Sequence, residues 1–252
     1  MFKQICAVAV VATLVSGARG VEAQECCGDC NANNEVTIDE IIKAVNRSLD
    51  GCQDDGVCSQ SGGQHFSASG QTTPYGPGSD GDVQAGAPLS YTDNGDGTIT
   101  DNNTRLMWEK KDDSGGIHDQ DNRYTWWGGV SEGYLMDGTM VTEFLATLNA
   151  GGGFAGHTDW RIPNVRELQS IVDYEIPSPG PTVNAAFHNA AGCTGCTDVT
   201  LASCSCTAAS PYWSSTTNRE NPLYAWDVYF AYGSVNIADK SSIRVRAVRG
   251  GS

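Results

Sequence analysis

A strict alternation of side chains runs from Ala225 to Ala231, near the C-terminus. One set of positions holds Trp226, Val228 and Phe230, and the other holds Asp227, Tyr229 and Ala231. A period of two residues is typical of a half-buried β-strand. Tyr232-Gly233 then suits a two-residue turn, after which Ser234 to Ile237 resumes the alternation. The sequence therefore predicts a β-hairpin close to the end of the chain.

The tryptophans indicate where a large core can form, because all six lie after residue 100. Residues 59–88 consist mainly of Gly, Ser, Gln, Pro and Asp, a composition typical of a flexible linker. The cysteine-rich stretch at 24–58 is too short to fold on apolar burial alone, so it needs disulfides or a metal. These features predict a small module at 24–58, a linker at 59–88 and a large domain at 89–252.

The large domain combines helical and strand patterns. Apolar residues at helical spacing predict helices over 140–148 and 164–174, with Asn164 as the N-cap of the second helix. Asp93 to Gly97 suits a tight turn between short strands. Helices embedded among short strands and long loops indicate an α+β fold.

Three ordered stretches resemble the Lcl C-terminal domain family. They are Tyr91–Asp101 with Leu106-Met107-Trp108, Gly156–Leu168, and the final segment from Tyr212 to Gly250. The resemblance implies a C-type-lectin-like fold, related to that of formylglycine-generating enzymes, with short strands and two helices. It implies no reaction.

The N-terminus resembles a secretory signal peptide. Lys3 precedes an apolar run from Ile5 to Val15, and Val21-Glu22-Ala23 forms a cleavage-site pattern. We therefore expect residues 1–23 to be removed and the protein to be secreted, either free or at the cell surface or in the periplasm. The formal net charge of −15 disfavours nucleic acid and anionic membranes as partners.

Cysteine usage agrees with export. Of ten cysteines, Cys6 lies in the signal peptide, which leaves nine. Four of these share the long loop at 176–211: Cys193, Cys196, Cys204 and Cys206. Their spacing admits either two disulfides or a zinc site, and the oxidising compartment favours disulfides. The odd cysteine of the N-terminal group is either free or paired with another chain.

A calcium loop is predicted in the N-terminal module. Calcium needs six or more oxygen ligands, supplied in an EF-hand by loop positions 1, 3, 5, 7, 9 and 12. Those positions are occupied by Asp29, Asn31, Asn33, Glu35 (through its carbonyl), Thr37 and Glu40. The stretch resembles a single dockerin-type or EF-hand repeat, so a small helical module is expected. Asn34 replaces the usual Gly and only two ligands are charged, so we expect weak affinity. The alternative is a disulfide-tied helix without an ion.

No catalytic motif stands out in the sequence. None of the four histidines lies in a recognisable nucleophile or metalloprotease pattern. Asp159, Arg161, Arg166 and Glu167 suit a buried ion-pair network better than an acid–base pair. We therefore expect a binding protein rather than an enzyme.

The final hairpin is the predicted ligand surface, for a glycan or a protein. Its outward positions combine aromatic and polar side chains: Tyr229, Tyr232, Ser234, Asn236 and Asp239. Three alternatives stay open. They are a variable binding protein diversified by a retroelement, which the final tract also resembles, an enzyme of the formylglycine-generating type, and a structural surface protein without a ligand.

Overall fold

The computed structural model describes residues 66–129 and 135–250. The chain divides into two compact units, Met1–Gly63 and Gln64–Ser252, and every described residue belongs to the second. The predicted signal peptide, the calcium loop and the N-terminal cysteines lie outside the described residues. The described part mixes antiparallel sheets with short helices, as expected of an α+β fold.

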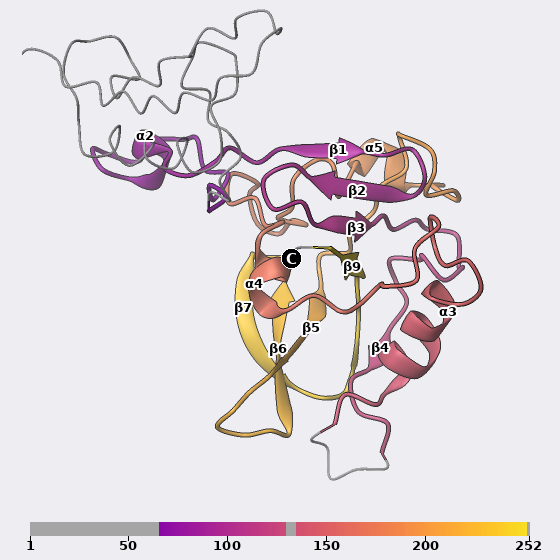
Figure 1. Ribbon diagram of the computed structural model, residues 1–252. Helices are drawn as coiled ribbons and strands as arrows, with labels where there is room; N and C mark the ends of the chain where they lie inside the picture. Colours follow the sequence, from indigo (N-terminus) through magenta and orange to yellow (C-terminus); the bar gives the residue numbers. More distant parts are fainter. Residues whose placement is uncertain (1–65, 130–134, 251–252) are drawn as a thin grey trace, which may run out of the picture. The chain divides into compact units, whose positions relative to one another are not determined.

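A four-stranded antiparallel sheet forms one side of the domain (Figure 1). Its order is β1 (Tyr91–Asp93), β2 (Thr98–Asp101), β3 (Met107–Glu109) and β9 (Val248–Arg249). The predicted turn joins β1 to β2, and Gly95 and Gly97 adopt the positive φ angles that it requires. Because β9 pairs with β3, a strand from the C-terminal segment completes the sheet formed by β1, β2 and β3.

The second sheet consists of β5 (Pro211–Thr217), β6 (Tyr224–Tyr229) and β7 (Ser234–Asp239), in that order. Its first two strands contribute side chains to two apolar cores. Val228 joins the core around Leu168, whereas Ala225 joins the core around Phe144. The expected alternation is present, but β6 buries side chains on both faces rather than on one.

The hairpin turn differs from the expected two-residue form. Strand β6 ends at Tyr229 and β7 begins at Ser234, so four residues connect them. The residues after Tyr229 bond elsewhere: Thr182 N donates to Phe230 O at 2.7 Å, and Gly180 N donates to Ala231 O at 3.1 Å. A segment from the long loop therefore takes the backbone positions that a tighter hairpin would have used.

Short helices complete the domain. A π-helical turn, η1 (Met140–Leu145), continues into α3 (Ala146–Leu148), where one helix is predicted. Helix α4 (Val165–Gln169) has the predicted N-cap, because the Asn164 side chain accepts hydrogen bonds from the backbone N–H groups of Arg166 and Glu167. The remaining elements are α2 (Asp80–Val83), α5 (Ala190–Cys193), and the paired strands β4 (Tyr124–Thr125) and β8 (Ser242–Ile243).

Helix α4 is shorter than the predicted helix at 164–174. Ser170 Oγ donates to Glu167 O at 2.7 Å, a local bond that competes with continued helix formation. Val172 then bridges to Val183 in an extended arrangement. The apolar residues at 171 and 172 are buried as expected, but they follow the helix instead of belonging to it.

Part of the predicted linker packs on the domain. Residues 66–88 contain α2 and a bridge between Ser67 and Ala87. Tyr174 N donates to Ser69 O at 2.9 Å, and Thr72 N donates to the Glu175 carboxylate at 2.7 Å. Within the described residues, the folded unit therefore begins upstream of Leu89. No described helix has the length and apolar character needed to cross a membrane.

Candidate functional site

Three tyrosines gather at the tip of the final hairpin. The rings of Tyr229 and Tyr232 meet edge to face with centroids 5.2 Å apart, a favourable geometry for an aromatic pair. Tyr174 Oη donates to Gly233 O at 2.9 Å, which places the third ring beside the turn. Tyr232 is 57% exposed and Tyr174 is 42% exposed. We call Tyr174, Tyr229 and Tyr232 the tyrosine cluster.

Gly233 makes this arrangement possible. Its φ is +66°, and a Cβ there would lie 3.1 Å from Tyr174 Cε1 and 2.8 Å from Val172 Cγ1. Sequence patterns do not predict a role for Tyr174, because its spacing places it at the end of a predicted helix. The only available signal was its place at the start of the long loop, where binding residues often occur.

The register of the hairpin separates the predicted ligand residues. Tyr229 pairs with Ser234, and Asn236 lies two residues further along β7. These three side chains share one face of the sheet. Asp239 pairs with Tyr224 and lies on the opposite face, so the five predicted positions do not form one continuous surface.

Asp227 is a buried carboxyl group within this hairpin. It pairs with Asn236 across β6 and β7, so it shares the face of Tyr229 and Ser234. Only 2% of Asp227 is exposed. Burial raises its pKa to about 6, and the hydrogen bond with Asn236 lowers it by less. The sequence placed Asp227 in the right set of alternating residues but gave no sign that this position is buried.

A network of charged groups lies inside the domain, at the end of β3. Glu109 Oε1 is 2.9 Å from Lys111 Nζ and 2.8 Å from His118 Nδ1, and Glu109 Oε2 accepts from Ala247 N at 3.0 Å. Burial by itself raises the pKa of Glu109, but Lys111 and His118 lower it more, so the pKa falls below its usual value. Burial lowers the pKa of Lys111.

Arg246 extends this network toward the disulfide loop. Its guanidinium donates to Glu109 O, Cys206 O and Thr207 Oγ1, each at 2.7 Å. Only neutral oxygens accept these three bonds, although Glu109 contributes favourably to the charge of Arg246 from nearby. We call Glu109, Lys111, His118 and Arg246 the buried network.

The buried network reaches the surface only at His118, whose side chain is 16% exposed. Glu109 and Arg246 are 0% exposed and Lys111 is 1% exposed. These groups hold β3, the loop after it and the C-terminal segment together. The ion-pair network predicted around Glu167 is smaller and less buried. Arg161 bonds Glu167 through two nitrogens, whereas Asp159 pairs with Arg249 at the surface.

All four loop cysteines form disulfides, as predicted. Cys193 is bonded to Cys206, and Cys196 to Cys204. The loop is also tied to the strand end, because Cys206 N donates to Lys111 O at 2.9 Å and Asp113 N donates to Cys196 O at 2.7 Å. The two disulfides therefore hold the long loop against the segment that carries the buried network.

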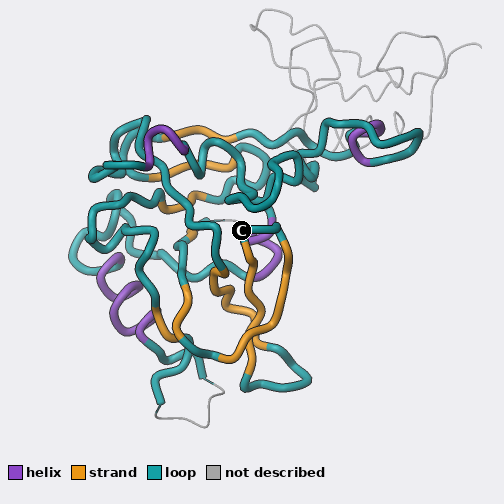
Figure 2. The backbone as a smooth tube through the Cα atoms, turned by 180° about the vertical axis from the view of Figure 1, so that it is seen from behind, coloured by secondary structure: helices purple, strands orange, loops and turns teal. Residues whose placement is uncertain are grey.

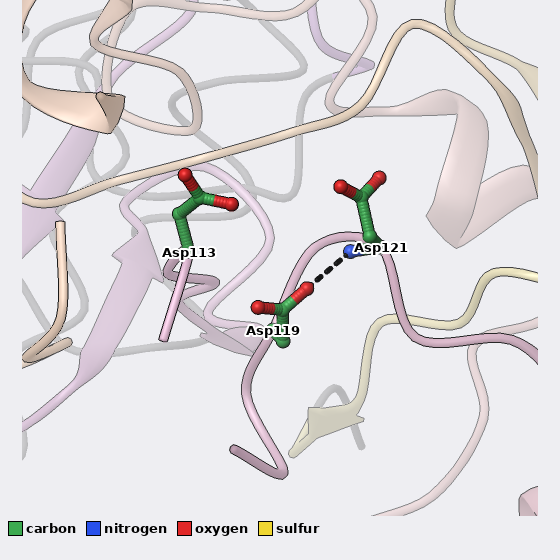
Figure 3. A group of neighbouring side chains, drawn as sticks. All are labelled: Asp113, Asp119 and Asp121. Atoms are coloured by element: carbon green, nitrogen blue, oxygen red, sulfur yellow. Dashed lines mark hydrogen bonds between the residues drawn. The ribbon is translucent and has the colours of Figure 1, made fainter. Parts of the chain in front are cut away.

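An acidic group lies near this segment (Figure 3). Asp113, Asp119 and Asp121 each present an oxygen within 4.8 Å of the others. The protein's own groups already bond two of them: Asp119 accepts from Gly115 N and Asp121 N, and Arg244 pairs with Asp121 at 2.6 Å. These bonds account for the arrangement without an ion.

An open cavity of about 560 Å³ lies beside the disulfide loop. Its walls are mostly alanine, with a few polar groups that already have partners. Ser205 Oγ donates to Ala186 O, Asn189 Oδ1 accepts from Gly192 N, and Asp93 pairs with Lys110. The cavity therefore offers few unpaired groups to orient a ligand. The tyrosine cluster is the better candidate for a binding surface.

Comparison with protein families identifies the domain. No curated protein matches the chain. The family model of the Lcl C-terminal domain matches residues 97–249, which cover β2 to β9, both disulfides and the tyrosine cluster. Because the match spans more than half of the sequence, the chain belongs to the Lcl C-terminal domain family.

Proposed function

We propose that this chain is an exported binding protein that recognises a glycan or a protein through the tip of its final hairpin. The observation that carries the proposal is the tyrosine cluster, where the rings of Tyr229 and Tyr232 meet and Tyr174 bonds the turn between them and β7. Tyrosine offers large contact area and a polar hydroxyl at low entropic cost, which suits binding surfaces. The two disulfides and the sequence of the first 23 residues support export.

Replacement of one exposed ring tests the proposal. Tyr232→Ala is expected to weaken binding to a ligand captured on glycan or extracellular-matrix protein arrays by about tenfold, because a central aromatic contact is lost. Leu223→Ala is the control, since Leu223 is also exposed but precedes β6, at the end of that strand opposite to Tyr229. Blank arrays, or equal loss in both variants, would contradict the proposed surface.

We propose that the protein is not an enzyme. The four loop cysteines are bonded to each other, so the loop offers no thiol pair of the kind that formylglycine formation would use. The strongest acid–base partners, Glu109 and Lys111, are enclosed by the domain. A cysteine-containing peptide incubated with the protein, with and without copper, tests this directly. Conversion of its cysteine to formylglycine would establish the enzymatic alternative.

We also propose a weak calcium site in the N-terminal module. The support is the loop spacing from Asp29 to Glu40, with oxygen-bearing residues at each ligand position. Glu40→Gln is expected to abolish calcium binding in calorimetry of the full chain, because the bidentate carboxylate is lost. Asp39→Asn is the control and should retain binding, since position 11 of the loop does not face the ion. Absence of heat at 10 mM calcium, about tenfold above the weak end of the usual range, would leave only the disulfide-tied helix.

A further inference from the structure

Strand β7 is the outer strand of its sheet. The strand order is β5-β6-β7, so among the described strands only β6 pairs with it. Figures 1 and 2 show β7 at the margin of the domain in both views, with no described strand beyond it. Its residues are partly or fully exposed along the whole length from Ser234 to Asp239. This leaves one edge of the strand open.

The hydrogen bonds of β6 determine which backbone groups of β7 face outward. Phe230 N donates to Ser210 O, so the even-numbered residues of β6 direct their backbone groups toward β5. Trp226 follows the same rule, because its carbonyl accepts from Ser214 Oγ on β5. The odd-numbered residues of β6 therefore bond to β7, through their register partners Ser234, Asn236 and Ala238.

The residues of β7 between those partners direct their backbone groups to the open side of the strand. Val235 and Ile237 direct both N–H and C=O groups away from β6. None of these four groups has a hydrogen-bond partner in residues 66–129 or 135–250. Two outward-facing residues with complete donor and acceptor pairs form the template that an added strand requires.

The edge carries few of the features that normally prevent strand addition. Natural edge strands are commonly protected by proline, lysine, a bulge or a covering segment. Residues 234–239 read Ser-Val-Asn-Ile-Ala-Asp, without proline or a basic residue, and all six pair with β6 in continuous register. Ile237 is 48% exposed, so an apolar side chain is accessible at the open edge. Asp239 supplies a single charge at one end.

We infer that β7 binds an extended basic peptide segment by strand addition. The inference rests on the proposed function and names the class of partner for the same hairpin. Charge decides between the two obvious occupants. A second copy of this chain would bring together two molecules with a net charge of −15 each, whereas a basic segment complements that charge.

The two faces of the hairpin indicate which kinds of side chain the added segment would carry at alternate positions. On one face Ile237 pairs with Trp226, which offers apolar contact to alternate side chains of the added strand. On the other face lie Ser234, Asn236 and the buried Asp227, which suit polar or basic side chains. A peptide that alternates apolar and basic residues fits both faces.

A capped heptapeptide of alternating lysine and valine, acetyl-Lys-Val-Lys-Val-Lys-Val-Lys-amide, is a suitable probe. Its addition to the full chain should slow hydrogen exchange of the Val235 and Ile237 amides, measured by NMR. Higher ionic strength should weaken binding, because salt screens the charge attraction. The matching peptide with glutamate in place of lysine should bind at least tenfold more weakly, since its charges repel those of the protein.

A pair of substitutions at one position separates backbone from side-chain effects. Val235→Pro removes an outward N–H without removing a bond to β6, and should weaken peptide binding about tenfold. Val235→Ala keeps the N–H and should bind within about threefold of the original chain. Thermal unfolding of both variants verifies that the hairpin remains folded.

Several outcomes would overturn the inference. They are equal binding by Val235→Pro and Val235→Ala, equal binding of the glutamate peptide, or sedimentation as a dimer with protected Val235 and Ile237 amides before any peptide is added. An array ligand that depends on Tyr232 but leaves both amides unprotected would overturn strand addition and support the proposed function. Blank arrays together with no peptide binding would contradict both.

Discussion

Glu109→Gln is expected to lower the free energy of unfolding by about 3–5 kcal/mol, because it leaves the ammonium group of Lys111 buried without a counterion. Lys111 Nζ lies 2.9 Å from Glu109 Oε1, and no other hydrogen-bond partner is found for it among the described residues. The Phe144 ring, 4.5 Å from Nζ, offers only a cation–π contact. Urea denaturation of the purified variant measures the loss directly.

An exposed ion pair provides the matched control. Asp159→Asn makes the same change of carboxylate to amide in the pair with Arg249, where the aspartate side chain is 59% exposed. Exposed pairs contribute about 0–1 kcal/mol, so this variant should unfold almost as the original protein does. Equal destabilisation by the two substitutions would contradict the role assigned to the buried network.

The double variant Glu109→Gln with Lys111→Met tests the cause of the effect. Removing the unpaired charge should restore much of the lost stability, because methionine fits a similar volume without an ammonium group. The pH dependence has a definite sign. The pKa of Glu109 is lowered in the folded state, so its contribution is present above about pH 4.3, the unfolded value, and is lost as the pH falls below it. Glu109→Gln should therefore reduce the sensitivity of the domain to acid.

The buried network could not be predicted from sequence patterns. Glu109, Lys110 and Lys111 are adjacent charged residues, which normally lie at a surface. Their burial depends on partners far along the chain, such as Arg246, whose guanidinium bonds the carbonyl of Glu109. Nothing in the local sequence specifies such a contact. The ion network predicted near Glu167 is present only in part, because Arg161 pairs with Glu167 at a partly exposed site while Asp159 pairs with Arg249. Burial is a property of the tertiary structure.

Local signals were more informative for the fold. Alternation identified β6, and the turn chemistry of Asp93 to Gly97 identified the β1–β2 connection, because both depend on neighbouring residues. Asn164 was identified as an N-cap for the same reason. The hairpin turn was predicted too short, since its length depends on backbone bonds from Gly180 and Thr182, about 50 residues earlier.

For the candidate site, the sequence identified single residues better than their arrangement. Tyr229 and Tyr232 were predicted, and their rings do meet. Tyr174 was missed, because its contact with Gly233 spans 59 positions. Asp239 was grouped with Ser234 and Asn236, although a separation of five or three residues on a strand places side chains on opposite faces. Because β7 pairs with β6 in continuous register, no bulge brings Asp239 back to the face that carries Ser234 and Asn236.

Asp227→Asn is expected to stabilise the domain above pH 7 and to have little effect near pH 4. The neutral amide resembles the protonated carboxyl group that burial favours. The pKa of Asp227 is raised to about 6 in the folded state, roughly two units above its usual value. That difference in pKa corresponds to a free-energy penalty of about 3 kcal/mol for the ionised form in the folded state.

The sign of the pH effect follows from the raised pKa. Below about pH 4 the carboxyl group is protonated in both the folded and unfolded states, so its ionisation does not lower the free energy of unfolding. Between about pH 4 and pH 6 the unfolded state loses its proton first, and stability falls as the pH rises through the folded pKa. Thermal unfolding of the original chain should show this loss, and Asp227→Asn should not.

Asp239→Asn is the control for this prediction, because it removes an exposed carboxylate from the same hairpin. Its effect on stability should stay within about 0.5 kcal/mol at either pH. If Asp227→Asn gives the same small change at pH 8 as at pH 4.5, the carboxyl group ionises freely in the fold. A clear gain at pH 8 alone would show that the hairpin retains an acid at the expense of stability. Perturbed acids of that kind are characteristic of functional sites, and Asp227 lies on the same face of the hairpin as Tyr229, opposite Asn236 of β7.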